Sequence, residues 1–164
     1  MAYVSRVLVV ASVTSTSDDL LDALRERVGR SPAAFHLLMP ASEPGVVGRE
    51  ALEPRLEQAL AVWHEAGLEA DGRVGDMDPV VAVSEAWDPR AFDEVIVSTL
   101  PGYASKWMQF NLPHRVARIT DSQVTHVAAG LPGAGKADYR PVPERERSAL
   151  GPLSVLSWGG GKRS

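Results

Sequence analysis

The sequence DEVIVSTLPGYASKWMQFNLPHRVARITDSQVTHV, residues 93–127, indicates a strand, a long loop, a helix and a second strand in succession. Its apolar run 95–97 ends at the hydroxyl pair Ser98 and Thr99, and a Pro-Gly turn signal follows at once. This pattern is expected where a buried parallel strand opens into a loop. Because ligands of open α/β sheets bind at this end of the strands, the loop after Thr99 is the first place where we expect a ligand.

The chain before this stretch alternates strand and helix signals. Apolar runs predict strands at 4–11, 34–39 and 68–74, and apolar residues at helical spacing predict helices over 18–28, 52–67 and 80–87, with 41–47 as a loop. Ser17, Asp76 and Asp78 stand at helix starts, where we interpret them as caps. Such alternation implies right-handed crossovers and a mostly parallel sheet with helices on both faces. Five strands and four helices fit before residue 130.

Bulk composition indicates one globular domain and a tail. A chain of 164 residues suits a single core, and 45% hydrophobic with 23% charged residues is ordinary for a globular protein. We expect the domain to span residues 1–129 and the Gly- and Pro-rich tail, 130–164, to be partly disordered or docked. The absence of cysteine excludes disulfides and thiolate metal sites and favours a cytoplasmic location.

Charge and hydropathy exclude two classes of partner. The net charge is −4, and since residues 130–164 carry six Lys/Arg against three Asp/Glu, or +3, residues 1–129 carry −7. An acidic domain is a poor partner for nucleic acid. The longest early apolar run, 7–11, is far shorter than the roughly 20 residues of a membrane span, so we also expect no membrane insertion.

Two stretches of this sequence are similar to the universal stress protein family. Val74-Gly75-Asp76, with Pro79 and the later run 93–97, resembles the family passage GDP…I…A…ADLIV. The long loop, the helix NLPHRVARIT and the strand VTHVAA stand where the family has its nucleotide loop, fourth helix and dimer-forming last strand. The resemblance implies a three-layer α/β/α sandwich of the adenine nucleotide alpha hydrolase-like, flavodoxin-like type. Its five-stranded parallel sheet should have the order 3-2-1-4-5, and a homodimer should form through residues 123–129.

The nucleotide loop departs from the family pattern. ATP-binding members carry G-x2-G-x9-G-[ST], and the four positions here are Ser98, Pro101, Asn111 and Leu112. A glycine can bring its N–H close to a phosphate, whereas Pro101 has no N–H. We therefore expect a regulatory or stress-associated, non-catalytic domain in which binding of ATP or AMP is weak or lost. An ATP-binding member with an altered loop is the alternative.

Candidate ligand-binding residues surround the ends of the first and fourth strands. They are Ser12, Thr14, Ser98, Thr99, Gly102 and Asn111, with Ser105 and Lys106 also available to an anion. The helix that begins near Asn111 adds free N–H groups. The competing interpretation is structural: Asn111 caps that helix, Thr99 satisfies local backbone, and Lys106 is solvated.

Other motifs carry weaker hypotheses. Residues 130–136, GLPGAGK, match a P-loop, but Ala137 replaces the Mg²⁺-binding Ser or Thr and a poor helix follows, so an NTPase acting through Lys136 is the least favoured function. His36 and His126 alternate with apolar neighbours and are interpreted as structural. No metal-ligand spacing or catalytic triad is found.

The loop 103–110 contains three large apolar side chains, Trp107, Met108 and Phe110. We expect them to fold back over the sheet, as is commoner. A protein-interaction module formed by this loop is the alternative.

Overall fold

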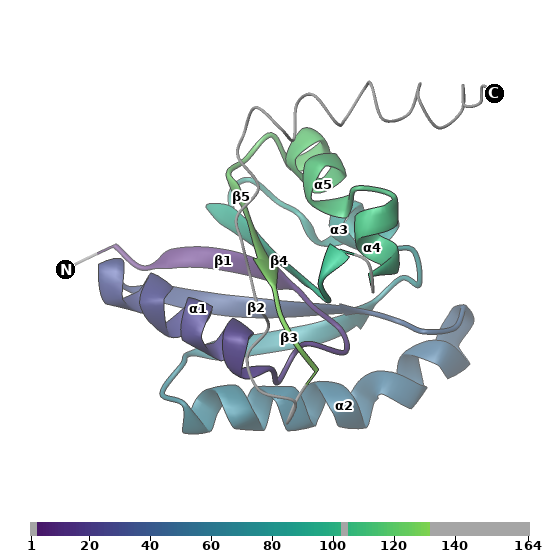
Figure 1. Ribbon diagram of the computed structural model, residues 1–164, viewed down its shortest axis with the longest axis horizontal. Coiled ribbons are helices and arrows are strands. Elements are labelled where there is room, and N and C mark those ends of the chain that lie inside the picture. The colour runs from purple at the N-terminus through teal and green to yellow at the C-terminus, as the bar shows by residue number, and fades with distance from the viewer. Residues whose placement is uncertain (1–2, 103–104, 132–164) are drawn as a thin grey trace.

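Strands and helices alternate along the chain, as its apolar pattern predicts. The computed structural model describes residues 3–102 and 105–131 (Figure 1). The strands are β1 (Ser5–Val10), β2 (Ala33–Pro40), β3 (Ala70–Gly75), β4 (Glu94–Thr99) and β5 (Val124–Ala128), and the helices are α1 (Asp18–Arg30), α2 (Gly45–Glu65), α3 (Pro79–Ala86), α4 (Lys106–Gln109) and α5 (Leu112–Thr120).

All five strands are parallel and lie in the order β3-β2-β1-β4-β5, which confirms the predicted sheet. β1 is central: Val9 is opposite Leu37 of β2 on one side and Ile96 of β4 on the other. Most of β1 and β4 is buried, because helices cover both faces and leave these strands no polar side. The predicted P-loop lysine, Lys136, and nearly all of the predicted tail lie outside the described residues.

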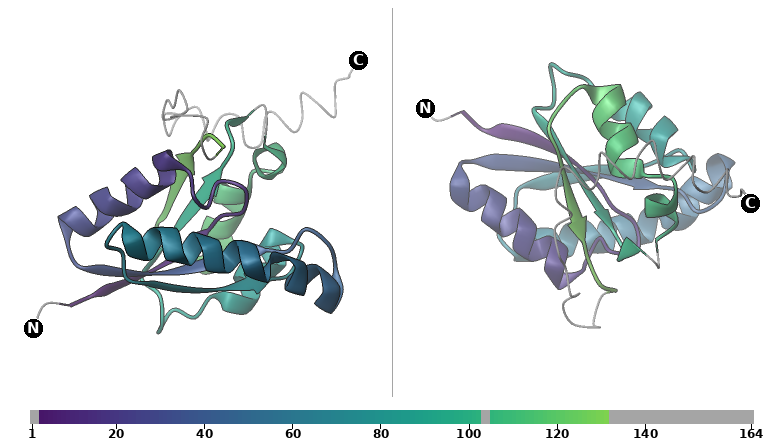
Figure 2. Two further views of the ribbon diagram at one scale, coloured as in Figure 1. Left: turned by 90° about the horizontal axis from the view of Figure 1, so that it is seen from below. Right: turned by 45° about the horizontal axis from the view of Figure 1, so that its top comes forward.

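Two apolar cores separate the sheet from its helices, which makes the three layers. One core packs Val7, Val9 and Leu37 against α1 and α2, and the other packs Leu8 and Val10 against α3 and α5. Seen from below in Figure 2, α1 and α2 lie together on one face of the sheet. Alternate residues of β1 therefore belong to different cores, as the two-residue period of a strand requires.

The predicted caps form hydrogen bonds at the starts of two helices. The Ser17 hydroxyl accepts from the Asp19 N–H at 3.2 Å at the start of α1, and the Asp78 carboxylate accepts from the Val80 N–H at 2.9 Å at the start of α3. Asp76 accepts from the Asp78 N–H. These carboxylates therefore act as caps, as predicted.

Two helix predictions were wrong in detail. α2 begins at Gly45, inside the predicted 41–47 loop, because Gly45 takes a φ of +81° that turns the extended chain into the helix. Its first turn exposes Val46 and Val47, so no apolar periodicity marks it. The described residues also contain a fifth helix, α4, which has only four residues and is too short to show a period.

Candidate functional site

A cavity of about 530 Å³ opens at the carboxyl ends of the central strands. β1 and β4 lie side by side, with Val10 opposite Val97, and the loops that leave them diverge to opposite faces of the sheet. The described residues that line the cavity are Ser12, Val13, Thr14, Pro40, Ala41, Ser42, Met77, Ser98, Thr99, Leu100, Ser105, Lys106 and Trp107. A space of this size accommodates a small organic ligand.

Four of the six predicted site residues meet in this cavity. Thr14 and Ser98, 84 positions apart, share a hydrogen bond of 2.7 Å between their hydroxyl oxygens, and both side chains are buried. Since this bond uses one hydroxyl hydrogen of the pair, the other hydrogen can be donated to a ligand. Ser12 also lines the cavity and is half-buried.

Thr99 lines the same cavity, but its hydroxyl group is already hydrogen-bonded to neighbouring protein atoms. Its hydroxyl donates to the Leu100 carbonyl at 2.7 Å and lies 2.8 Å from Nε2 of His126. Because a hydroxyl has one hydrogen, Nε2 of His126 is the donor in the second bond. Thr99 thus satisfies local backbone and orders β5, as the structural interpretation stated, and His126 has a structural partner.

Gly102 and Asn111 do not line the cavity. Gly102 is exposed, and a Cβ built on it meets nothing within 4 Å, so no close approach of the backbone requires glycine there. Asn111 stands at the N-cap of α5 with a φ of +57°, and its side chain makes no capping hydrogen bond. Its position at the helix start was predicted, and its assignment to a ligand site stays a prediction.

The short helix α4 brings the long loop over the cavity. The buried Ser105 hydroxyl caps α4 by accepting from the Met108 N–H at 3.2 Å. Lys106 is exposed at the rim and Trp107 is half-buried against the core beneath α5. Trp107 therefore folds back as predicted, whereas Phe110 keeps 39% of its surface exposed, with the Arg115 guanidinium 5.7 Å from its ring centre.

The sequence interpretation missed the contribution of the β2 and β3 ends. Pro40 is the last residue of β2, Ala41 and Ser42 follow it, and Met77 follows β3. The available signal was topological, because all parallel strands end at the same edge, and the loops of neighbouring strands must converge there.

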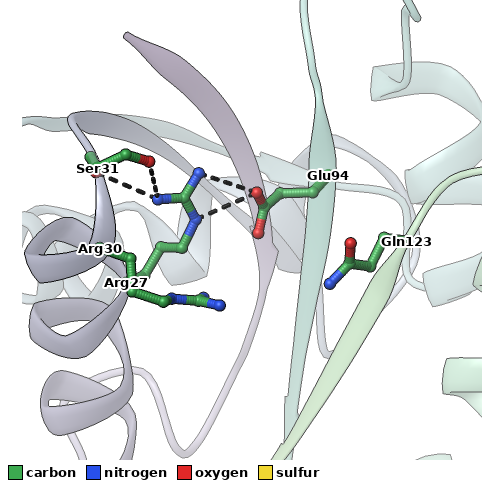
Figure 3. A pocket seen from close by; sticks show the side chains of 5 residues that line it. All are labelled: Arg27, Arg30, Ser31, Glu94 and Gln123. Carbon is green, nitrogen blue, oxygen red and sulfur yellow. Dashed lines mark hydrogen bonds and ion pairs between the residues drawn. The ribbon is translucent and has the colours of Figure 1, made fainter.

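A second, smaller hollow of about 180 Å³ lies at the opposite edge of the sheet, where α1 ends and β4 begins (Figure 3). Arg27 donates to one carboxylate oxygen of Glu94 through Nε at 3.1 Å and Nη2 at 3.0 Å, and its Nη1 contacts the backbone and hydroxyl oxygens of Ser31. All three nitrogens of the Arg27 guanidinium thus form hydrogen bonds with protein oxygens, which indicates a structural role. At the same edge, the hydrogen bond from Tyr3 to Asp93 raises the pKa of the Tyr3 hydroxyl.

Three further observations concern the described residues. His36, the other histidine interpreted as structural, pairs with Asp71 at 2.8 Å. Residues 3–102 and 105–131 contain no group of three His, Cys, Asp or Glu side chains that could hold a metal. The same residues form no helix of the length and apolarity needed to cross a membrane.

Comparisons with known proteins identify the fold. No family model matches the chain, and no curated protein matches it. Solved structures do match. A universal stress protein in complex with cAMP is 20% identical, with a TM-score of 0.54, and the match covers 77% of this chain and 98% of that one.

Two other solved structures agree with this result. A universal stress protein from Archaeoglobus fulgidus is 13% identical, with a TM-score of 0.55 over 77% of this chain and 95% of that one. A family protein from Arabidopsis thaliana with AMP bound is 14% identical, with a TM-score of 0.53 over 77% and 92%. The predicted resemblance is therefore confirmed at the level of the fold: this chain has the α/β fold of the universal stress proteins.

Proposed function

We propose that this protein is a non-catalytic, universal-stress-protein-like domain that binds an adenine nucleotide weakly in the cavity at the carboxyl ends of β1 and β4. The observation that carries the proposal is the cavity itself, with the Thr14–Ser98 hydroxyl pair buried in its wall. Structures of the same fold hold cAMP and AMP, which supports an adenine nucleotide as the ligand class.

We expect weak affinity for a nucleotide because the loop after β4 offers few hydrogen-bond donors to a phosphate group. Tight phosphate binding uses converging backbone N–H groups, often from glycines. Pro101 has no N–H, and Gly102 lies outside the lining. Among the described lining residues, the side chains that can bind a phosphate are the hydroxyls and Lys106. Each hydroxyl bond contributes only about 0.5–1.5 kcal/mol net, so we expect dissociation constants well above those of a glycine loop.

The absence of turnover follows from the side chains available. A hydroxyl nucleophile needs a base within hydrogen-bond reach, and the described lining residues include no histidine and no carboxylate. We expect no phosphate release from ATP by the full chain. Release that disappears in Lys136→Ala would instead support the P-loop hypothesis, because that lysine is the only one in the motif.

The test of binding is a calorimetric titration of the full chain with AMP and ATP. Thr14→Val removes the buried hydroxyl at nearly constant shape, and we expect about a tenfold loss of affinity, equivalent to 1.4 kcal/mol. Thr16→Val is the matched control, because Thr16 lies in the same loop outside the lining. Asn111→Ala should leave affinity unchanged. Micromolar binding that Asn111→Ala abolishes would overturn both the weak-binding proposal and the assigned cavity.

We also propose a homodimer formed through residues 123–129, a cytoplasmic location and a regulatory or stress-associated role. Support for the dimer comes from the position of β5 at one edge of the sheet, where unpaired backbone groups can pair with a second copy. Light scattering of the purified protein tests it, and a monomer at high micromolar concentration would contradict it. Interaction through the 103–110 loop is the alternative; Trp107→Ala that removes the dimer without unfolding the chain would favour it.

A further inference from the structure

We infer that the cavity selects its ligand by charge: it takes an organic anion with one or two negative charges, such as a cyclic or simple nucleoside monophosphate, in preference to a nucleoside triphosphate. Lys106 is the residue that sets this selectivity. The inference rests on the proposed function, and it specifies which members of the nucleotide class bind.

The first argument is the charge of the lining. Six hydroxyl side chains face the cavity, and Lys106 carries the only charge among its described lining residues; the hydroxyls are those of Ser12, Thr14, Ser42, Ser98, Thr99 and Ser105. A phosphate monoester carries about −1.5 to −2 at pH 7 and a cyclic phosphodiester about −1, whereas a triphosphate carries about −4. One ammonium group compensates all of the charge of the cyclic phosphodiester and half or more of the charge of the monoester, but it leaves most of the triphosphate charge without a partner.

The second argument concerns Mg²⁺, which usually accompanies a triphosphate. Proteins hold Mg²⁺ through one or two carboxylates together with the phosphates. The described lining residues include no Asp or Glu. The lining therefore offers Mg²⁺ only neutral hydroxyls. The ion offsets about two of the four negative charges of the triphosphate, but it adds no carboxylate contact that would anchor the triphosphate to the protein.

The third argument is the charge of the rim. Asp76 and Asp78 stand on either side of Met77, which lines the cavity, and both are committed to capping the start of α3. Arg49 lies 3.9 Å from Asp76 and offsets part of this charge. Carboxylates that neighbour a lining residue in the sequence disfavour each added negative charge of a ligand, and the −7 of residues 1–129 acts in the same direction.

The positions of Lys106 and the hydroxyl pair suggest how the ligand lies. Lys106 is exposed on α4, at the cavity rim, whereas Thr14 and Ser98 are buried. An anionic group is best placed near the rim, where the ammonium reaches it. The neutral part of the ligand then lies deeper, against the hydroxyl pair and the half-buried Trp107 ring, which offers an apolar aromatic surface.

The experiment is a set of calorimetric titrations of the full chain with adenosine, cAMP, AMP and ATP, the last with and without Mg²⁺. We expect cAMP and AMP to bind at least tenfold more tightly than ATP without Mg²⁺, and we expect Mg²⁺ to narrow that gap because it offsets part of the triphosphate charge. Lys106→Met should weaken cAMP and AMP about tenfold and leave adenosine unchanged. Arg118→Ala, which removes an exposed cation of α5 outside the lining, is the control and should change nothing.

The possible failures are distinguishable. If ATP without Mg²⁺ binds as tightly as AMP, or if Lys106→Met weakens adenosine as much as AMP, charge selection is wrong while the proposed binding function stands. If none of the four ligands binds, adenosine included, the proposed function fails together with this inference. Lys106 is exposed, so circular dichroism melts of the variant should match those of the wild type and confirm that the fold is intact.

Discussion

Replacing Trp63 by Phe tests how the scaffold holds the cavity loop. Trp63 is fully buried in α2, and its indole N–H donates to the Ser15 carbonyl at 2.8 Å, while its ring meets that of Phe35 edge to face. Phe keeps an aromatic ring but has no donor, so the buried carbonyl loses a partner. That loss alone should lower the free energy of unfolding by about 1–3 kcal/mol, and the smaller ring adds to it because the core relaxes only in part.

The measurement is urea unfolding followed by circular dichroism, with thermal melts alongside. Each kcal/mol should lower Tm by about 2–8 °C in a domain of this size. Trp87→Phe is the matched control: Trp87 is half-buried and stacks on Phe92 at the other end of the sheet. Hydrogen exchange should rise for residues 12–17 in Trp63→Phe only. If the two variants lose the same stability within about 0.5 kcal/mol, or if exchange of 12–17 does not rise, the hydrogen bond does not hold the loop and the reasoning fails.

Two other changes test the packing of the scaffold. Arg27→Ala leaves the carboxylate of Glu94 without its buried partner and should lower the free energy of unfolding by about 3–5 kcal/mol. Arg25→Ala, from an exposed pair on the same helix, should change it by less than about 1 kcal/mol; equal losses would contradict a structural role for Arg27. Gly72→Ala places a Cβ 2.6 Å from a backbone oxygen of β2 and should destabilise by about 1–3 kcal/mol. Gly29→Ala, in a helix with open space around it, should be neutral or stabilise by up to about 1 kcal/mol, and urea unfolding that ranks the pair in reverse would refute the steric argument.

The sheet could be predicted because its central strands are unbroken runs of apolar residues. Runs 7–10 and 95–97 are buried on both faces, and only parallel strands between two helix layers require such runs. The start of α2 was not predictable, since the turn depends on the positive φ of Gly45 and the first helical turn faces solvent. The length and period of an apolar pattern identify a helix or strand, whereas the residue at which that element begins or ends depends on the backbone conformation of a single residue.

The site was predictable to the extent that it follows from topology. Thr14 and Ser98 meet because β1 and β4 are neighbours and both end at the same edge. Residues of the long loop could not be placed in the same way, because a loop of irregular backbone has no period. Ser105 and Lys106, at the start of the four-residue helix α4, line the cavity, whereas Asn111, at the start of α5 with a left-handed backbone, does not. Nothing in the composition of the loop distinguishes these outcomes.

The cavity and its chemistry depend on different parts of the molecule, and this explains why a shared fold does not fix the ligand. Its floor is the end of β1 and β4, where Val10 and Val97 are fully buried in the core, so the space persists whether or not a ligand fills it. Its charge comes from Lys106, and its hydroxyl donors come from the ends of β1, β2 and β4 and from the loops that follow them. Among the described lining residues after β4, Trp107 is the one that packs against a core. Residues of the loop after β4, such as Pro101, which has no backbone N–H, can therefore alter the groups that the cavity offers to a ligand while the fold is kept.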